Sequence, residues 1–201
     1  MKLYYSATSP YARKVVVLIA EAAIKGVEIA VAAGTPIAPD PGVIARNPLG
    51  KTPALERDEA PTLYDSRVIC QFLDDMVGSG FYPSGPRRWD TLTIEATADG
   101  ILDAALLMVY ETRIRPEDKR FDPWVEGQWS KIDRALDVLE TRWISHLNGR
   151  MDMGHIAVGC ALGYLDLRHG ARQWRAARPH LAAWEAGFAA RPSMQSTAPS
   201  V

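Results

Sequence analysis

The pattern of apolar and polar residues divides the chain into a mixed part and a helical part. Residues 3–5 and 27–31 are short runs rich in aromatic or β-branched residues, which is typical of strands. Between them, Ser9 and Pro10 form a helix start, with serine at the N-cap and proline at the first helical position, and Gly26 is a natural stop. A strand, a helix and a strand in so short a stretch predict a parallel pair joined by a crossover helix.

A hairpin and another helix are predicted after a loop that includes Pro36, Pro39, Pro41 and Gly42. Residues 54–56 and 62–64 are short strand candidates, and the polar segment 57–60 between them is a turn candidate. Asp65-Ser66 caps a helix that extends to about Val77. The buried face of that helix is predicted to carry Val68, Ile69, Phe72 and Leu73.

Glycine, serine and proline interrupt the pattern at 78–86, which is the best linker candidate in the chain. Beyond it the pattern is helical and no convincing strand occurs. The sequence therefore predicts an α/β domain over 1–77 and an all-helical domain over 87–201. The tail from 192 to 201 is polar, and we expect it to be frayed. The helical patterns cover residues 87–113, 123–147, 155–169 and 179–190.

Composition and charge narrow the classes of function. The 201 residues are 47% apolar with a formal net charge of −1, which fits a globular protein. Neither half is strongly basic, so nucleic acid is not an expected partner. No apolar run approaches the roughly 20 residues of a membrane helix, and the N-terminus is too short and polar for a signal peptide, so we expect a cytoplasmic protein. Cys70 and Cys160 lie in helical patterns and are predicted to be buried thiols.

The segment Asn47–Glu56 places two prolines and a glycine before a short apolar run. Pro53 at the entry to a strand suits an edge or a bend. The backbone groups of Thr52 are then available to an extended peptide that adds to the sheet as a strand. A cis bond before Pro53 would aim that backbone outward, whereas a trans bond would contradict this interpretation. Taken alone, the segment is also compatible with an ordinary loop-to-strand turn.

Four segments together carry a family resemblance: Ser9–Val15, Asn47–Leu55, Asp65–Ile69 and Ala98–Asp103. In this order and spacing the chain resembles the cytosolic glutathione S-transferases, most of all bacterial, serine-type members. The resemblance implies a thioredoxin-like domain, β-α-β-α-β-β-α, followed by an all-α domain. It also implies a homodimer and a detoxification enzyme that uses glutathione as co-substrate without a metal.

The resemblance further implies a site for glutathione. The Thr52 backbone, beside a cis Pro53, would pair with the cysteinyl part of the tripeptide. Asp65 would hold the ammonium of the γ-glutamyl end, and Ser66 would hold its carboxylate. Lys51 would meet the glycyl carboxylate. The family often has glutamate at the position of Asp65, so the side chain that makes this contact is one methylene group shorter here.

Activation of the glutathione thiol is assigned by resemblance to Ser9. The thiol has an ordinary pKa of about 8.5, and only the thiolate is a good nucleophile. A hydroxyl at a helix N-terminus can donate to the sulfur where the helix favours an anion. Ser6 and Thr8 are nearby alternatives for this role, and Ser9 is also a good N-cap whatever its chemistry. Asp99 matches an acid that reaches the γ-glutamyl amine across a dimer interface in some relatives.

The expected acceptor is a small, electrophilic and largely apolar molecule, held between the two domains. Tyr11, Leu106 and Tyr110 are candidates for its pocket, with Met108 and Val109 beside them, although such spacing is also typical of a helical core. The leading function is thiolate transfer to this acceptor.

A non-catalytic binding or stress-response module and a glutathione-dependent isomerase remain alternatives to the transferase. A thiol–disulfide reductase is disfavoured because reduction normally needs a cysteine at the start of the first helix. Residues 9 and 12, the two positions of a Cys-x-x-Cys pair, are serine and alanine here. Three histidines, His146, His169 and His180, show no metal-ligand spacing. His155 replaces the reciprocal acid of a capping box with Asp152, which predicts a weaker helix start there.

Overall fold

The computed structural model describes residues 1–199, and these form two compact units. One, here called the sheet unit, consists of residues 1–82 and 192–199, and the other, the helical unit, consists of 83–191. The division after residue 82 falls inside the segment 78–86 that the sequence predicts as a linker.

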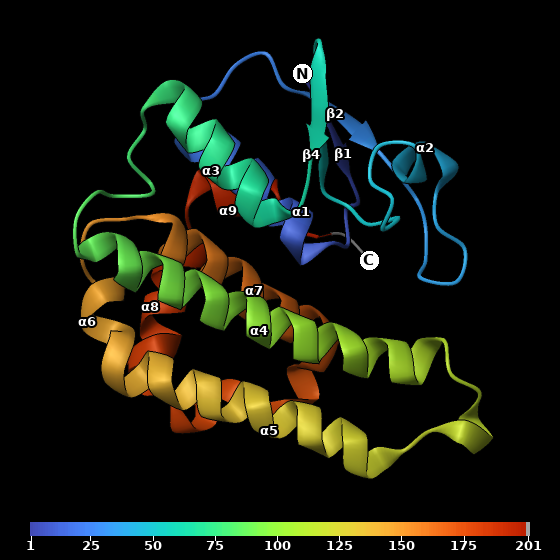
Figure 1. Ribbon diagram of the computed structural model, residues 1–201. Coiled ribbons are helices and arrows are strands. Elements are labelled where there is room, and N and C mark those ends of the chain that lie inside the picture. The colour runs from blue at the N-terminus through green and yellow to red at the C-terminus, as the bar shows by residue number, and fades with distance from the viewer. Residues whose placement is uncertain (200–201) are drawn as a thin grey trace. The chain divides into compact units, whose positions relative to one another are not determined.

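The sheet unit follows the predicted order β-α-β-α-β-β-α and has the thioredoxin-like arrangement. Its elements are β1 (Lys2–Tyr5), α1 (Pro10–Glu21), β2 (Glu28–Val31), α2 (Pro41–Ile44), β3 (Ala54–Arg57), β4 (Ala60–Leu63), α3 (Ser66–Val77) and, from the other end of the chain, α9 (Pro192–Ser196). Within the described residues the strand order is β2-β1-β3-β4. β1 is parallel to β2 and antiparallel to β3, which is antiparallel to β4. Figure 1 shows α1 and α3 together on one side of the sheet and α2 on the other.

The hairpin and its following helix differ in detail from the sequence prediction. The turn contains only Asp58 and Glu59, fewer residues than predicted, so β4 begins earlier, at Ala60. β4 ends at Leu63, one residue before the predicted end. Glu59 adopts a left-handed φ of 56°, which lets the chain reverse direction within this short turn. On α3, Val68 is 45% exposed, which corrects its predicted place on the buried face. It precedes the fully buried Ile69 by one residue and so points to another side of the helix.

The carboxyl-terminal segment is ordered as a helix and does not fray as predicted within the described residues. α9 belongs to the sheet unit and packs against α1, although the sequence assigns it to the helical domain. Arg13 on α1 is buried and donates to the backbone oxygen of Met194 at 2.9 Å and to Thr197 Oγ1 at 3.3 Å. Ser193 and Met194 are also buried. Residues 200–201 of the predicted tail lie outside the described residues.

Replacing Arg13 with methionine is expected to lower the free energy of unfolding by about 2 kcal/mol, because hydrogen bonds from a charged donor to buried acceptors are lost. Lys25→Met, at an exposed position of the same unit, is the matched control and should change stability by less than about 0.5 kcal/mol. Urea unfolding of both variants measures the difference. Equal stabilities would show that the contact with the carboxyl-terminal segment contributes nothing.

The helical unit has no strand within the described residues, in agreement with its pattern. Its helices are α4 (Arg87–Arg113), α5 (Asp122–Val138), α6 (Ile144–Leu147), α7 (Met153–His169) and α8 (Pro179–Ala189), with short turns at Glu117–Lys119, Gly170–Arg172 and Trp174–Ala177. α4 packs against both α5 and α7 (Figure 1). The predicted helix over 123–147 is interrupted by a π-helical turn at Leu139–Trp143.

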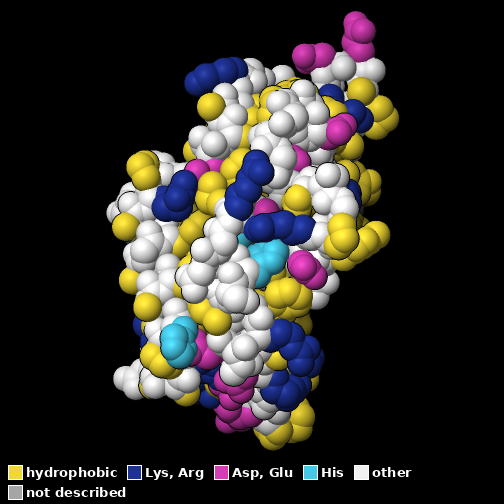
Figure 2. All heavy atoms as spheres, turned by 90° about the vertical axis from the view of Figure 1, so that its left-hand side faces the viewer, with side chains coloured by type: hydrophobic (Ala, Val, Ile, Leu, Met, Phe, Trp, Pro, Cys, Tyr) yellow, Lys and Arg dark blue, Asp and Glu magenta, His cyan; other side chains and the backbone are white. Residues whose placement is uncertain are grey.

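Both Cys70 and Cys160 are buried free thiols, as predicted. On the face drawn in Figure 2, basic side chains are interspersed with acidic and hydrophobic ones. Among residues 1–199, no helix combines the length and apolar character that crossing a bilayer requires.

Candidate functional site

The strand topology brings three predicted site segments to one end of the sheet. β1 ends just before Ser9, and its residue Tyr4 pairs with Ala54 at the start of β3. Leu55 pairs with Leu63, so β4 ends beside the start of β3 and leads directly to Asp65. The segments that contain Ser9, Thr52-Pro53 and Asp65-Ser66 therefore share one end of the sheet. The N-termini of α1 and α3 are at this end too, and helix N-termini attract anions.

Ser9 is the N-cap of α1 and keeps its hydroxyl proton available. Its Oγ accepts a hydrogen bond of 3.2 Å from the Ala12 backbone N–H. A hydroxyl that accepts through one lone pair still has its O–H to donate. Ser9 is half-buried, and its backbone N–H donates to the Ser6 carbonyl at 2.9 Å. The cap and the predicted chemistry therefore use different parts of the same side chain.

The loop before β3 is held by a buried asparagine. Asn47 Nδ2 donates to the Lys51 carbonyl at 2.8 Å, and Asn47 Oδ1 accepts from the Leu49 backbone N–H at 3.0 Å. These bonds fix the residues next to Pro53, whose peptide bond with Thr52 is cis, as the sequence interpretation requires. Lys51 is exposed at this loop. No local sequence signal marks Asn47 for this positioning role, because its partners are backbone groups of the folded loop.

Asp65 and Ser66 begin α3. Asp65 Oδ1 accepts from the Arg67 backbone N–H at 3.0 Å, and Arg67 Nη2 lies 3.1 Å from Oδ2. Partial burial alone would raise the pKa of Asp65. The hydrogen bonds from Arg67 and the positive charge of Lys14 outweigh it and lower the pKa. The carboxylate is therefore ionised at neutral pH, and Ser66 is buried as the first residue of the helix.

The remaining predicted site residues lie on two other helical faces. Tyr11 is half-buried on α1, in the sheet unit. Asp99, Leu106 and Tyr110 are on α4, in the helical unit. Asp99 is buried, whereas an acid on a long helix is usually solvated. Burial raises the pKa of Tyr110.

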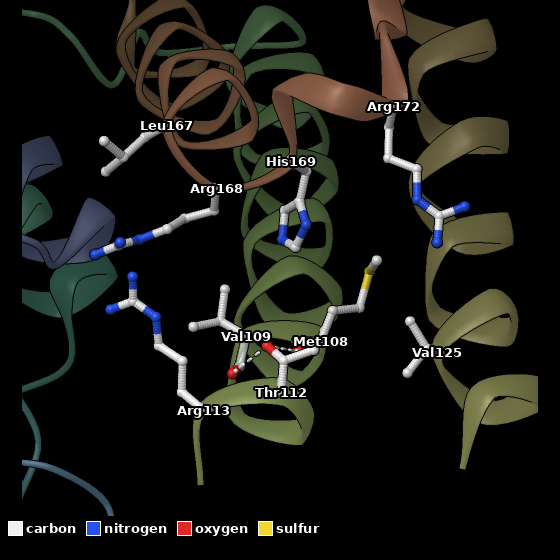
Figure 3. A pocket seen from close by; sticks show the side chains of 9 residues that line it. All are labelled: Met108, Val109, Thr112, Arg113, Val125, Leu167, Arg168, His169 and Arg172. Carbon is white, nitrogen blue, oxygen red and sulfur yellow. Dashed lines mark hydrogen bonds between the residues drawn. The ribbon is translucent and has the colours of Figure 1, made fainter. Parts of the chain in front are cut away.

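The helical unit contains a pocket of about 290 Å3. Figure 3 shows side chains from α4, α5 and the end of α7 around it. Its lining residues are Met108, Val109, Thr112, Arg113, Val125, Leu167, Arg168, His169 and Arg172. Met108 and Val109 were predicted neighbours of an acceptor site, but Leu106 and Tyr110 do not line this pocket. Arg113, Arg168 and Arg172 come to the pocket from separate segments of the chain, so no local sequence pattern marks them.

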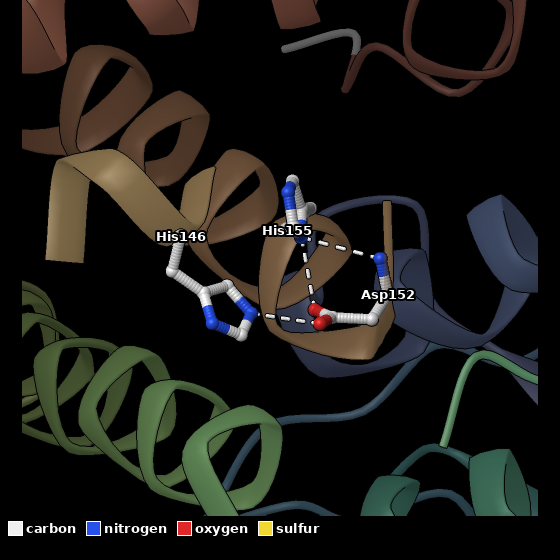
Figure 4. A group of neighbouring side chains, drawn as sticks. All are labelled: His146, Asp152 and His155. Atoms are coloured by element: carbon white, nitrogen blue, oxygen red, sulfur yellow. Dashed lines mark hydrogen bonds and ion pairs between the residues drawn. The ribbon is translucent and has the colours of Figure 1, made fainter. Parts of the chain in front are cut away.

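A group of side chains that could ligate a metal lies at the start of α7. It consists of His146, Asp152 and His155, and one potential ligand atom from each lies within 4.8 Å of the others. Figure 4 shows both histidines directed at the Asp152 carboxylate, with His146 Nε2 at 2.7 Å and His155 Nδ1 at 2.9 Å. That carboxylate also accepts from Thr91 Oγ1 at 2.9 Å and from Arg87 Nη2 at 3.2 Å. Protein donors thus already occupy the oxygens that a metal would need, and we interpret the group as a helix cap.

This cap corrects the expectation of a weak helix start. His155 Nδ1 is 3.2 Å from the Asp152 backbone nitrogen as well as 2.9 Å from its carboxylate. His155 Nδ1 thus accepts from the Asp152 backbone N–H, and the Asp152 carboxylate accepts from the Gly154 backbone N–H at 3.1 Å, so the box is reciprocal without an acid at position 155. Burial would raise the pKa of Asp152, but the histidines and Thr91 hold it well below its ordinary value.

Comparisons with known proteins identify the family and agree with the fold. The chain matches the family described as "Glutathione S-transferase, N-terminal domain" over residues 8–76 and the corresponding C-terminal domain over 122–187. It is 36% identical to the uncharacterized GST-like protein YibF of Escherichia coli K12, over 99% of this chain and 98% of that protein. A glutathione transferase family member from Pseudomonas fluorescens Pf-5, in a crystal structure with bound glutathione, is 45% identical, with a TM-score of 0.97 over 100% of this chain and 99% of that one.

A second crystal structure from Pseudomonas fluorescens Pf-5, with bound S-(propanoic acid)-glutathione, is 44% identical and has a TM-score of 0.92 over the full length of both chains. The chain therefore belongs to the glutathione S-transferase family. Its sheet unit and helical unit correspond to the two domains that define that family.

Proposed function

We propose that the protein binds glutathione at the common end of β1, β3 and β4 and joins it, through its thiolate sulfur, to an electrophile. The observation that carries this proposal is the convergence of Ser9, Thr52-Pro53 and Asp65-Ser66 at one sheet end. The relatives whose crystal structures contain glutathione or a propanoic acid thioether of it support the same ligand.

Each part of glutathione has a suitable partner in this arrangement. The Thr52 backbone pairs with the extended cysteinyl residue as an added strand. The ionised Asp65 attracts the γ-glutamyl ammonium, and Ser66 at the N-terminus of α3 attracts its carboxylate. Lys51 neutralises the glycyl carboxylate.

Ser9 then stabilises the thiolate. Its O–H, free of the cap, donates to the sulfur, and the N-terminus of α1 adds a favourable partial charge. The thiol proton leaves to solvent, and the thiolate attacks an electrophilic carbon of a small, largely apolar acceptor, from which the leaving group departs. Asp99 and Tyr11 are proposed to act, respectively, through a homodimer partner and as part of the acceptor wall.

Retention of the protein on immobilised glutathione, followed by a conjugation assay with a chloronitrobenzene, tests the proposal. Retention with measurable conjugation is expected. Retention without turnover would support the non-catalytic module instead. No retention and no turnover would contradict both.

Replacing Asp65 with asparagine is expected to weaken glutathione binding about tenfold, because a charge-assisted contact with the ammonium is lost. Asparagine still caps a helix well, so α3 should remain intact. Asp75→Asn, at an exposed position on the same helix, is the control and should bind normally. Calorimetric titration gives both affinities, and an unchanged affinity of the Asp65 variant would remove Asp65 from the site.

A further inference from the structure

The carboxyl-terminal helix α9 packs against α1 within the sheet unit and is hydrogen-bonded to it at two places (Figure 1). Near the start of α1, Arg13 donates to the Met194 carbonyl at 2.9 Å and to Thr197 Oγ1 at 3.3 Å. At the last residue of α1, Glu21 Oε1 accepts a short hydrogen bond from Ser193 Oγ. Because these two places on α1 are about 12 Å apart along the helix axis, α9 holds most of the length of α1.

The contacts between the two helices form one buried network. Arg13, Ser193 and Met194 are all buried. A buried guanidinium needs hydrogen-bond acceptors, and both acceptors of Arg13 among residues 1–199 are uncharged groups of the carboxyl-terminal segment. Thr197 Oγ1 donates in turn to the Ser193 carbonyl at 2.7 Å, which links the contact at Arg13 to the contact at Glu21. A change at one end of the network therefore affects the other end.

The part of α1 that this network reaches is the turn that carries Ser9. The first N–H groups of a helix have no partner within the helix, so a first turn frays easily. In α1 this turn is closed by the Ala12 N–H, which donates to Ser9 Oγ at 3.2 Å, and by the Arg13 N–H, which donates to the Ser9 carbonyl at 3.0 Å. Because the Arg13 side chain is fixed on α9, this turn cannot unwind without breaking buried hydrogen bonds.

The position of α1 depends on its neighbours more than on its own helix. It has 12 residues, a length at which an isolated helix is marginal in water. α3 also packs against α1. Apolar packing is non-directional, whereas hydrogen bonds allow only a narrow range of lengths and angles. The polar contacts with α9 therefore restrict sliding and rotation of α1 more closely than apolar packing does.

We propose that α9 is a positioning element for thiol activation, which holds the first turn of α1 so that the Ser9 hydroxyl points at the bound sulfur. The inference rests on the proposed transferase function and adds a determinant of that function outside the residues that contact glutathione. A displacement of about 1 Å in a catalytic group can cost about a hundredfold in rate. α9 acts only through α1 and does not touch the reacting atoms.

The test uses variants of the full chain that change α9 and leave α1 intact: Ser193→Ala, Thr197→Val and the two combined. The combined variant is expected to lower kcat for glutathione conjugation about tenfold, with the KM for glutathione within about twofold of wild type. Ultraviolet titration should show a raised pKa for its bound thiol. Thr197→Ser keeps the hydroxyl and should behave like wild type. Ser196→Ala removes an exposed hydroxyl of the same helix, which bonds only to the Ser193 carbonyl, and is the matched control.

Amide hydrogen exchange without glutathione tests the positioning step separately from the chemistry. In the combined variant, the amides of Ala12 and Arg13 should exchange at least about fivefold faster than in wild type, while those of α3 should not change. Thermal unfolding sets an assay temperature at which every variant is folded. Unchanged exchange, or a combined variant with the kcat and thiol pKa of wild type, would overturn the positioning role. Wild-type protein without conjugation activity would instead contradict the proposed function and, with it, this inference.

Discussion

Replacing Ser9 with alanine is expected to lower kcat for glutathione conjugation about a hundredfold, as removal of one preorganised donor to a developing or stabilised anion typically does. The reason is that the Ser9 O–H is free to donate while its Oγ accepts from Ala12. The KM for glutathione should change little, because the peptide contacts lie elsewhere. Ultraviolet titration should show a raised pKa for the bound thiol.

Two kinds of control separate this chemistry from the role of Ser9 as a cap. Ser9→Asp retains a good N-cap but places a negative charge beside the sulfur. This variant should therefore fold like wild type but, unlike wild type, should be inactive. Ser6→Ala and Thr8→Ala remove the neighbouring hydroxyls and should keep nearly full activity. If either of these lost activity while Ser9→Ala kept it, the donor would have to be reassigned.

Replacing Asp152 with alanine is expected to lower the free energy of unfolding by about 3–4 kcal/mol, because buried polar partners of its carboxylate are left without an acceptor. Asp152 is 2% exposed, and its oxygens contact His146, His155, Thr91 and Arg87. Asp152→Asn keeps the cap without the charge and should lose roughly half as much. Asp118→Ala, at an exposed turn, is the control and should stay within about 0.5 kcal/mol of wild type.

The Asp152 carboxylate also makes the free energy of unfolding depend on pH. Its folded-state pKa is depressed below the ordinary value of 3.8, so the folded state binds the proton less readily than the unfolded state. The stabilisation is therefore fully present above the unfolded pKa and decreases as the pH falls toward the folded pKa. Urea unfolding between neutral and acidic pH should show the difference between wild type and Asp152→Ala shrinking in acid. A constant difference would contradict this linkage.

Local signals made much of the sheet unit predictable. Ser9 and Pro10 begin α1, and Asp65 caps α3, as the residue types alone indicate. The turn at Glu59 was placed too broadly, since only backbone conformation shows how few residues close it. Val68 was misplaced because a run of apolar residues does not fix which side of a helix is buried.

Features that depend on contacts between distant segments were not predictable. The order of the carboxyl-terminal helix rests on Arg13, about 180 positions away in the chain, whose partners no local pattern reveals. His146, Asp152 and His155 meet because α6 and α7 are joined by a short turn, and their spacing matches no metal motif. Arg113 and Arg168 share a pocket only because α4 packs against α7.

Backbone amide NMR during a glutathione titration tests the central claim most directly. Binding at the common end of β1, β3 and β4 predicts the largest shifts at the amides of Thr52 and Ser66 and in the first turn of α1. Half-saturation is expected between roughly 1 μM and 1 mM glutathione, the range usual for the KM values of enzymes. Shifts confined to the helical unit, or none at about 10 mM, well above that range, would contradict the account.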